Sequence, residues 1–170
     1  SLVVNYDFDF ATLTSATTKS TIEEITTAAS STLVLGPAPG TPLDFFYYNQ
    51  ATSAKGFSQE LRLTSILDSR VNWTLGVFYD DLEDSYFEAG SDIYLGGSPL
   101  SISTATNMLD GTSTSKSVFG NISYNMTDKV TVDLGGRYYE DDKSQLFLFD
   151  GVVLSDKTAS FDNTSFRGAL

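Results

Sequence analysis

The side chains in this sequence that could do chemistry are mainly carboxylates. They form two groups, Asp80, Asp81, Glu83 and Asp84 in the first and Glu140, Asp141 and Asp142 in the second. Several carboxylate oxygens held together would suit Ca²⁺. However, no spacing matches a defined calcium-binding loop, which favours the competing interpretation of a solvated acidic surface. These residues are therefore weak candidates for a surface cation site, and the sequence predicts no other metal site.

Other chemistry is restricted by composition. The chain has no histidine and no cysteine, which removes imidazole bases, imidazole or thiolate metal ligands, and disulfides. The sequence therefore predicts no catalytic residue, no cofactor and no enzyme. With 22 acidic against 10 basic residues, the net charge is −12, which disfavours binding to nucleic acid phosphates.

The clearest structural pattern lies between Ser117 and Asp142. Apolar and polar residues alternate on both sides of the short polar segment Met126–Lys129. A period of two on both sides of a tight turn predicts an antiparallel β-hairpin. Each arm has about ten residues, the length that a tilted strand needs to cross a bilayer.

A second hairpin is predicted upstream, with arms near 55–67 and 71–82 joined by Asp68-Ser69-Arg70. In both hairpins one face is apolar and the other is polar. The apolar face carries Val71, Trp73, Leu75, Val77, Val130, Val132 and Leu134. The opposite face carries Glu60, Arg62, Asp133 and Arg137.

Two further strands are expected, one from about Val3 to Thr17 and one starting near Ser160. The prediction is therefore an all-β chain of about six antiparallel strands. Long connections after the first, third and fifth strands, the last two near 83–116 and 142–157, alternate with short turns. Outer-membrane β-barrels have this asymmetry, with short periplasmic turns and long extracellular loops.

The segments FGNISYNMTDKVTVDLGGRYYEDDK and GFSQELRLTSILDSRVNWTLGVFYDDLEDSYF carry a family resemblance. Both resemble barrel hairpins of TonB-dependent outer-membrane receptors. The resemblance implies that the apolar face named above meets lipid and that Glu60, Arg62, Asp133 and Arg137 face the barrel lumen. It also implies a location in the bacterial outer membrane, in contact with lipid and with lipopolysaccharide, which divalent cations normally bridge.

About six strands are fewer than the eight of the smallest membrane barrels and far fewer than the 22 of the receptors. We therefore expect residues 1–170 to be an internal part of one barrel domain, without the plug domain. The resemblance implies active uptake of a scarce nutrient, such as a siderophore-bound iron, cobalamin or an oligosaccharide. The TonB complex would act through a missing N-terminal region.

Two other functional classes remain open from the sequence. One is a small passive or adhesive barrel, with Leu33–Leu35 and Ile93–Leu95 counted as extra strands. The other is a soluble secreted β-sandwich that binds a ligand, in which Val130, Val132, Leu134 and Tyr138 would be buried by protein. Aromatic residues at 45–48, 86–87 and 147–149 could stack on sugars, pack loops together, or join Tyr79, Tyr138 and Tyr139 in an interfacial girdle.

Overall fold

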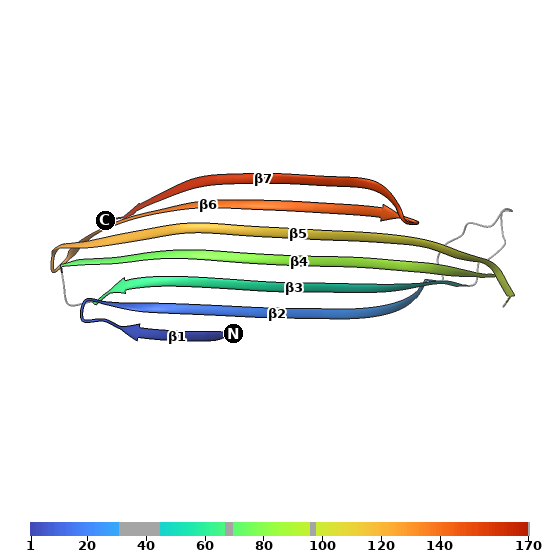
Figure 1. Cartoon of the computed structure of the whole chain (residues 1–170), viewed down its shortest axis with the longest axis horizontal. Helices are drawn as coiled ribbons and strands as arrows, with labels where there is room; N and C mark the ends of the chain where they lie inside the picture. Colours follow the sequence, from blue (N-terminus) through green and yellow to red (C-terminus); the bar gives the residue numbers. More distant parts are fainter. Residues whose placement is uncertain (31–44, 67–69, 96–97, 170) are drawn as a thin grey trace.

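The computed structural model describes residues 1–30, 45–66, 70–95 and 98–169. These residues form one seven-stranded sheet in which every strand pairs with its neighbour in the sequence (Figure 1). All pairs are antiparallel. The prediction of an all-β, antiparallel chain is therefore confirmed. No helix in the described part of the chain is long and apolar enough to cross a membrane.

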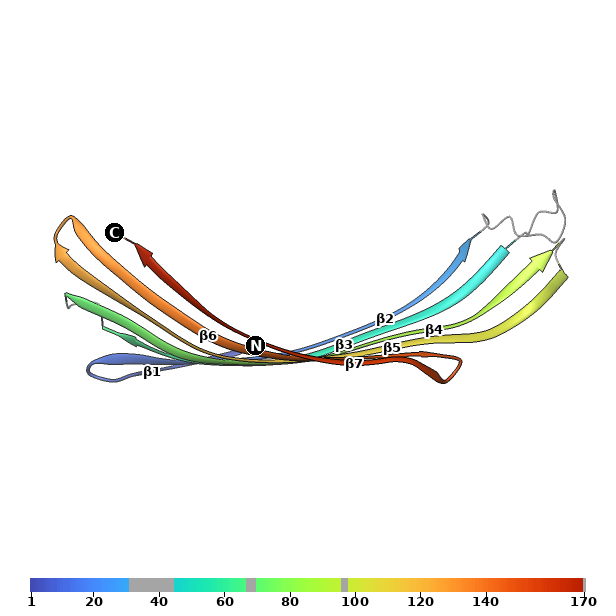
Figure 2. The same cartoon turned by 90° about the horizontal axis from the view of Figure 1, so that it is seen from above.

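The strands occur in simple meander order. Their bounds are β1 Leu2–Asp7, β2 Ala11–Ser30, β3 Phe45–Ser65, β4 Val71–Leu95, β5 Ser98–Thr127, β6 Val130–Phe149 and β7 Val152–Ala169. β5 is the longest, with 30 residues. At a rise of about 3.3 Å per residue such a strand spans about 100 Å, several times the thickness of a bilayer's hydrocarbon core. Figure 2 shows that the sheet is a single curved layer.

Both predicted hairpins are confirmed. β5 and β6 join through Asp128 and Lys129, and Val118 pairs with Tyr138. β3 ends at Ser65 and β4 begins at Val71, so the second turn lies where the sequence places it, although residues 67–69 are outside the described part.

The prediction of one strand from Val3 to Thr17 is wrong, because this segment folds back on itself as β1 and β2. The turn comprises Phe8, Asp9 and Phe10, and the Phe8 amide donates to the Ala11 carbonyl at 2.8 Å. The Phe8 ring contacts those of Tyr6 and Phe10, with centroids 4.7 and 5.8 Å apart. Aromatic residues in the turn continue the apolar alternation, and no Gly or Pro interrupts it. The sheet therefore has seven strands rather than about six.

The long connections predicted near 83–116 and 142–157 are also wrong. Those residues extend β4, β5, β6 and β7, and Ile93–Leu95 is the end of β4 rather than a separate strand. The strands there are rich in Ser, Thr and Asp, so apolar alternation gives no signal, while cross-strand hydroxyl bonds are common. Thr112 pairs with Ser144 at 2.7 Å, for example. The first long connection, expected between about Thr17 and residue 55, is wrong at both ends, because β2 extends to Ser30 and β3 begins at Phe45. Residues 31–44, which include Leu33–Leu35, lie outside the described residues.

The β6–β7 turn, at the end of the sheet opposite the β5–β6 turn, is tight and is hydrogen-bonded to β5. Asp150 and Gly151 have φ values of 48° and 74°, as expected for a two-residue type I′ turn, in which both central residues are left-handed. The Asp150 amide donates to the Thr106 carbonyl at 2.9 Å, and the Thr106 amide donates to Asp150 Oδ1 at 2.7 Å. The turn is thereby attached to β5.

A conventional core is missing from the described residues. Among the residues whose side chains the structure describes, Ala11 is the only buried hydrophobic one, and the described strands contain no second sheet. Leu75 and Leu134 are 58% and 57% exposed. The sandwich interpretation required the apolar face to be covered by protein, and this arrangement contradicts it for the described part of the chain.

Candidate functional site

Strand register sorts the side chains onto two chemically different faces. Cross-strand partners share a face, and successive residues along a strand alternate between faces. All seven residues predicted to meet lipid lie on one face: Val71, Trp73, Leu75, Val77, Val130, Val132 and Leu134. Glu60, Arg62, Asp133 and Arg137 lie on the other, which we call the polar face. The predicted separation of the two sets is thus present.

The apolar residues form a continuous band, which we call the apolar belt. It comprises Leu13, Leu61, Leu63, Val71, Trp73, Leu75, Val77, Val118, Ile122, Tyr124, Val132, Leu134, Tyr138 and Phe166. From Val71 to Tyr79 the belt extends about 27 Å along β4 at a normal rise per residue. With a strand tilt of about 40°, its height is about 20 Å, close to the apolar band of a membrane barrel.

Aromatic side chains lie at both margins of the apolar belt. Trp73 and Tyr124 are near the β3–β4 and β5–β6 turns, and Tyr79 and Tyr138 are at the other margin. The Tyr79 ring lies 6.2 Å from the ring of Phe57. Tyr139, which the sequence analysis grouped with these residues, lies on the polar face instead, because it follows Tyr138 directly in the strand.

At the level of the apolar belt, the apolar side chains of this sheet are more exposed than the polar ones, which is the reverse of the arrangement in a water-soluble sheet. On β4 and β5 the apolar Leu75, Val77, Val118 and Ile122 are exposed, whereas the polar-face residues Asn72, Thr74, Asn121 and Ser123 are only partly exposed. Phe119 on this face lies across Gly76, and a Cβ added at that glycine would overlap the phenyl ring. The polar face therefore packs more closely than the apolar one.

Arginine is concentrated on the polar face at the level of the apolar belt. Arg62, Arg137 and Arg167 line one pocket of about 650 Å³, together with Glu60 and the aromatic rings of Phe78 and Phe119. Register places Arg62 and Arg137 in one cross-strand row and Arg167 in the neighbouring row. Arg167 lies within the strand that the sequence predicted to start near Ser160, but no face was predicted for that strand. Of the charged residues in the pocket, only Glu60, Arg62 and Arg137 were therefore predicted for this face.

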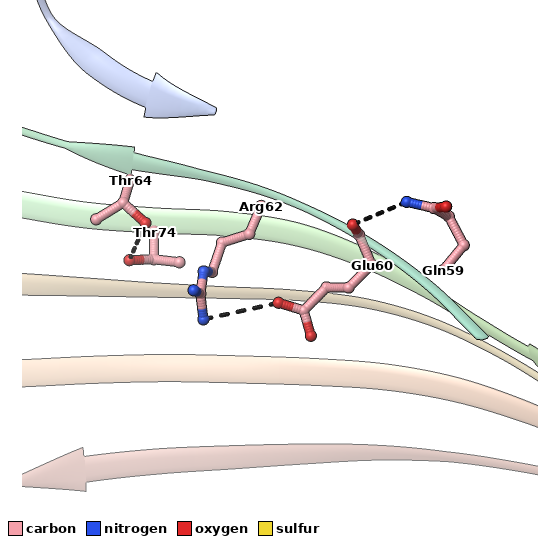
Figure 3. A network of polar contacts seen from close by, with 5 residues as sticks. All are labelled: Gln59, Glu60, Arg62, Thr64 and Thr74. Carbon is pink, nitrogen blue, oxygen red and sulfur yellow. Dashed lines mark hydrogen bonds and ion pairs between the residues drawn. The ribbon is translucent and has the colours of Figure 1, made fainter. Parts of the chain in front are cut away.

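Glu60 and Arg62 are successive polar-face residues of β3. Figure 3 shows both side chains projecting to the same side, with Arg62 Nη1 3.6 Å from Glu60 Oε1. The neighbouring Thr64 and Thr74 hydroxyls are 3.5 Å apart across β3 and β4. The ion pair is long and exposed, so it neutralises Arg62 only weakly.

Arg167 and Arg137 differ in their partners. Arg167 Nη2 donates to Asn121 Oδ1 at 3.0 Å, and that oxygen lies only 2.9 Å from where a Cβ on Gly135 would be. Glycine at position 135 thus leaves room for the Asn121 amide. Within residues 1–30, 45–66, 70–95 and 98–169, the Arg137 guanidinium makes no hydrogen bond or ion pair.

Asp133 lies on the polar face, one cross-strand row closer to the β5–β6 turn than Arg167. Its carboxylate accepts a short hydrogen bond from the Ser123 hydroxyl and forms no ion pair with a described arginine. It does not line the arginine pocket.

The acidic cation candidates are divided between the two faces, because neighbours along a strand alternate. Asp80, Asp84 and Asp141 lie on the polar face, and Asp81, Glu83, Glu140 and Asp142 lie on the other. No group of three or more carboxylates that could hold a metal ion is found in the described ranges. Asp141 is instead held by Lys143 Nζ at 3.0 Å and by the hydroxyls of Ser113 and Ser115. The Lys143 hydrogen bond is the main cause that lowers the Asp141 pKa.

A polar network that the sequence did not reveal surrounds Glu88, far beyond the apolar belt. Its carboxylate accepts from Tyr86 Oη at 2.6 Å, from Gln50 Nε2 at 3.0 Å and from Asn107 Nδ2 at 3.3 Å. These hydrogen bonds, that of Tyr86 first, lower the pKa of Glu88 against the opposing effect of burial. The residues come from three strands, and only the pairing register brings them together.

The aromatic groups singled out from the sequence are not brought into one cluster. Residues 45 and 46 begin β3, and the side chains of 45–48 lie outside the described part. Tyr86 and Phe87 lie on opposite faces, whereas Phe147 and Phe149 share the polar face. Leu109 on β5 separates Tyr86 from Phe147 in one cross-strand row.

Comparison with solved structures gives a clear match for the fold. The chain is similar to the ferric yersiniabactin uptake receptor FyuA from Yersinia pestis, with a TM-score of 0.67 and 14% sequence identity. The match covers 96% of this chain and 23% of that receptor, so the chain spans about a quarter of its length. No family model and no curated protein matches the sequence. The seven-stranded open sheet thus has the fold of part of a TonB-dependent receptor barrel.

Proposed function

We propose that this chain is part of the barrel wall of a bacterial outer-membrane receptor that takes up a scarce nutrient by TonB-dependent active transport. One observation carries the proposal. The apolar belt is exposed on a single-layer sheet, while the polar face is the more closely packed one. Water would penalise such an arrangement, whereas hydrocarbon on the belt side and a hydrated lumen on the other side would stabilise it.

The dimensions of the strands support the same proposal. A belt about 20 Å high occupies only one end of strands that continue far beyond it. In the proposed orientation, the end with the β1–β2, β3–β4 and β5–β6 turns faces the periplasm. The long, polar ends of β2 to β7 extend outside the cell, where lipopolysaccharide and ligand are met.

The edges of the sheet support a place within a larger barrel. β1 pairs with only the first part of β2, and β7 has one neighbour, β6. Open edges are unstable in a bilayer because unpaired backbone groups meet no water there. We infer that further strands flank β1 and β7, and that a plug domain and the TonB-interacting segment belong to other parts of the same receptor.

The nutrient class is proposed from the similar structure. That protein is a ferric yersiniabactin uptake receptor, and a siderophore-bound iron is accordingly our first candidate ligand. Cobalamin and oligosaccharides are the other candidates. The chain's own residues would supply the wall and outer surface, with no catalytic role and no cofactor.

The test uses bacteria that express the full receptor containing this chain. Energised cells should accumulate a radioactive ferric siderophore, and an uncoupler that collapses the proton-motive force should abolish the accumulation. Uptake that continues unchanged with the uncoupler would contradict active transport and would favour a passive barrel. A receptor that is absent from the outer-membrane fraction would contradict the proposed location.

A further inference from the structure

The arginine pocket on the polar face is an unusual concentration of positive charge. The chain has a net charge of −12 and contains four arginines, of which three line this pocket. Glu60 is the only acidic residue in its lining. The pocket therefore has a formal charge of +2 in a strongly acidic chain, and its cations are not explained by pairing within the lining.

The three guanidinium groups are available to a ligand to different degrees. Arg137 has no hydrogen-bond or ion-pair partner among the described residues. Arg62 has one long ion pair, at 3.6 Å, and Arg167 bonds only the neutral amide of Asn121. Each guanidinium keeps several free N–H donors, whose planar fork matches a carboxylate.

Register places these groups at distances that one small ligand can bridge. Arg137 pairs with Ser165, and Arg167 pairs with Gly135, so the two arginines are diagonal neighbours with Cβ atoms about 7–8 Å apart. Arg62 is three strands from Arg137 in the same row, with Gly76 and Phe119 between them. A ligand over Phe119 could therefore contact arginines at both ends of the pocket.

Two phenyl rings give the pocket an apolar floor. Phe78 and Phe119 are half-buried in its lining, and Gly135 and Gly136 contribute only backbone atoms there. A volume of about 650 Å³ lies in the range of small-molecule sites, about 300–1,000 Å³. This combination suits a small molecule that has several carboxylates and an apolar or aromatic body.

We propose that Arg62, Arg137 and Arg167 form a binding site for a small polycarboxylate, with Phe78 and Phe119 contacting its apolar part. Asn121 is a positioning residue that holds the Arg167 guanidinium. The site lies on the wall of the lumen in the proposed function, so it would act on an anion inside the passage. Binding itself does not depend on transport.

The probe is benzene-1,3,5-tricarboxylate, titrated calorimetrically into the full receptor in detergent at low ionic strength. The uncharged triamide of the same ring is the ligand control. We expect the tricarboxylate to bind, the triamide not to bind, and added salt to weaken binding.

The protein variants use the fourth arginine as a matched control. Arg137→Gln combined with Arg167→Gln should weaken binding by roughly tenfold or more, because two charge-assisted contacts are lost. Asn121→Ala should weaken it less, and Arg70→Gln, outside the pocket, should not change it. Far-ultraviolet circular dichroism confirms that each variant folds.

Absence of binding to the unmodified receptor would overturn the proposal, as would equal binding by the double variant. Either result would leave the transport assay unaffected. Conversely, uptake that is insensitive to the uncoupler would remove the proposed function while the calorimetric result still stood.

Discussion

The same strands follow different rules in their two halves. In the half that contains the apolar belt, one face is apolar across six strands and the other is polar, so the register is set by the need to keep the two apart. In the far half of β4 to β7, Ser, Thr and Asp occupy both faces, as in the pair Thr112–Ser144 on the belt side and the pair Ser113–Asp141 on the polar face. There the backbone ladder and cross-strand hydroxyl bonds hold the strands together. The comparison shows that strands can pair whether or not their two faces differ in polarity.

The far half does contain one apolar row on the belt side of the sheet. Ile25, Ala51, Phe87, Met108, Leu148 and Val153 are aligned across six strands. The neighbouring row nearer the belt contains Glu23, Ser85 and Asp110, and the row on the other side contains Thr27, Asn49 and Thr106. A single row is too narrow to span a bilayer, so only the belt half has membrane dimensions.

The largest predicted effect comes from placing a charge in the apolar belt. Leu75→Arg should destabilise the receptor in lipid vesicles by about 2–4 kcal/mol, because the guanidinium would enter hydrocarbon. Ser85→Arg, on the same face of β4 but in the far half, should change stability by less than about 0.5 kcal/mol. Denaturant unfolding in vesicles measures both. Equal effects at the two positions would remove the distinction between the halves.

Steric contact on the polar face gives the next largest effect. Gly76→Ala places a methyl group where the Phe119 ring lies, and we expect a loss of about 1–3 kcal/mol from the forced displacement. At Gly168 the nearest side-chain atom to a new Cβ is Leu134 Cδ2 at 3.7 Å, an ordinary contact. Gly168→Ala should therefore be close to neutral in the same unfolding assay. If Gly76→Ala left the free energy of unfolding unchanged, the polar face would have room for a methyl group beside Phe119, and the close packing inferred for this face would be contradicted.

A smaller effect is expected at the far-half turn. Gly151 has φ of 74°, so Gly151→Ala should cost about 1 kcal/mol locally. Hydrogen exchange should become faster at the amides of Asp150 and Thr106, which are bonded at this turn, while amides at the belt stay unchanged. Faster exchange throughout the sheet would mean that the two halves unfold together.

The smallest effect is a pH dependence at Glu88. Its pKa is lowered from an ordinary value of 4.5, so the network's stabilisation is present above that value. It is lost as the pH falls through the lower folded pKa. Protection from hydrogen exchange around Tyr86 and Asn107, corrected for the intrinsic exchange rate at each pH, should therefore fall on acidification below about pH 4.5. Glu88→Gln should remove this pH dependence. A variant that kept the pH dependence of the unmodified protein would contradict the assignment of the effect to Glu88.

The sequence predicted the belt half better than the far half for a physical reason. Apolar alternation near Val71–Val77 and Val130–Leu134 distinguishes two chemically different faces, so the faces and the turn positions follow from it. Between 83 and 116 both faces are polar, and a strand there looks like a loop. At Phe8–Phe10 the opposite failure occurs, because aromatic turn residues continue an alternation that the backbone does not.

The site was partly predictable for the same reason. The sequence identified four of the polar-face residues because each alternates with apolar residues along its strand: Glu60, Arg62, Asp133 and Arg137. Arg167 was not identified because no face was predicted for the strand expected from about Ser160, and the Glu88 network depends on pairings between distant segments. Register also separated the carboxylates at 80–84 and 140–142, which sequence proximity alone had grouped.

Trp73 allows a direct test of the central claim, because it is the only tryptophan in the chain and lies in the apolar belt. In a receptor whose other tryptophans are replaced by phenylalanine, its fluorescence is measured in vesicles containing brominated lipid and, separately, with aqueous acrylamide. We predict a blue-shifted emission that brominated lipid quenches strongly and acrylamide quenches weakly. A red-shifted emission quenched by acrylamide and insensitive to brominated lipid would contradict the claim that this face meets the membrane.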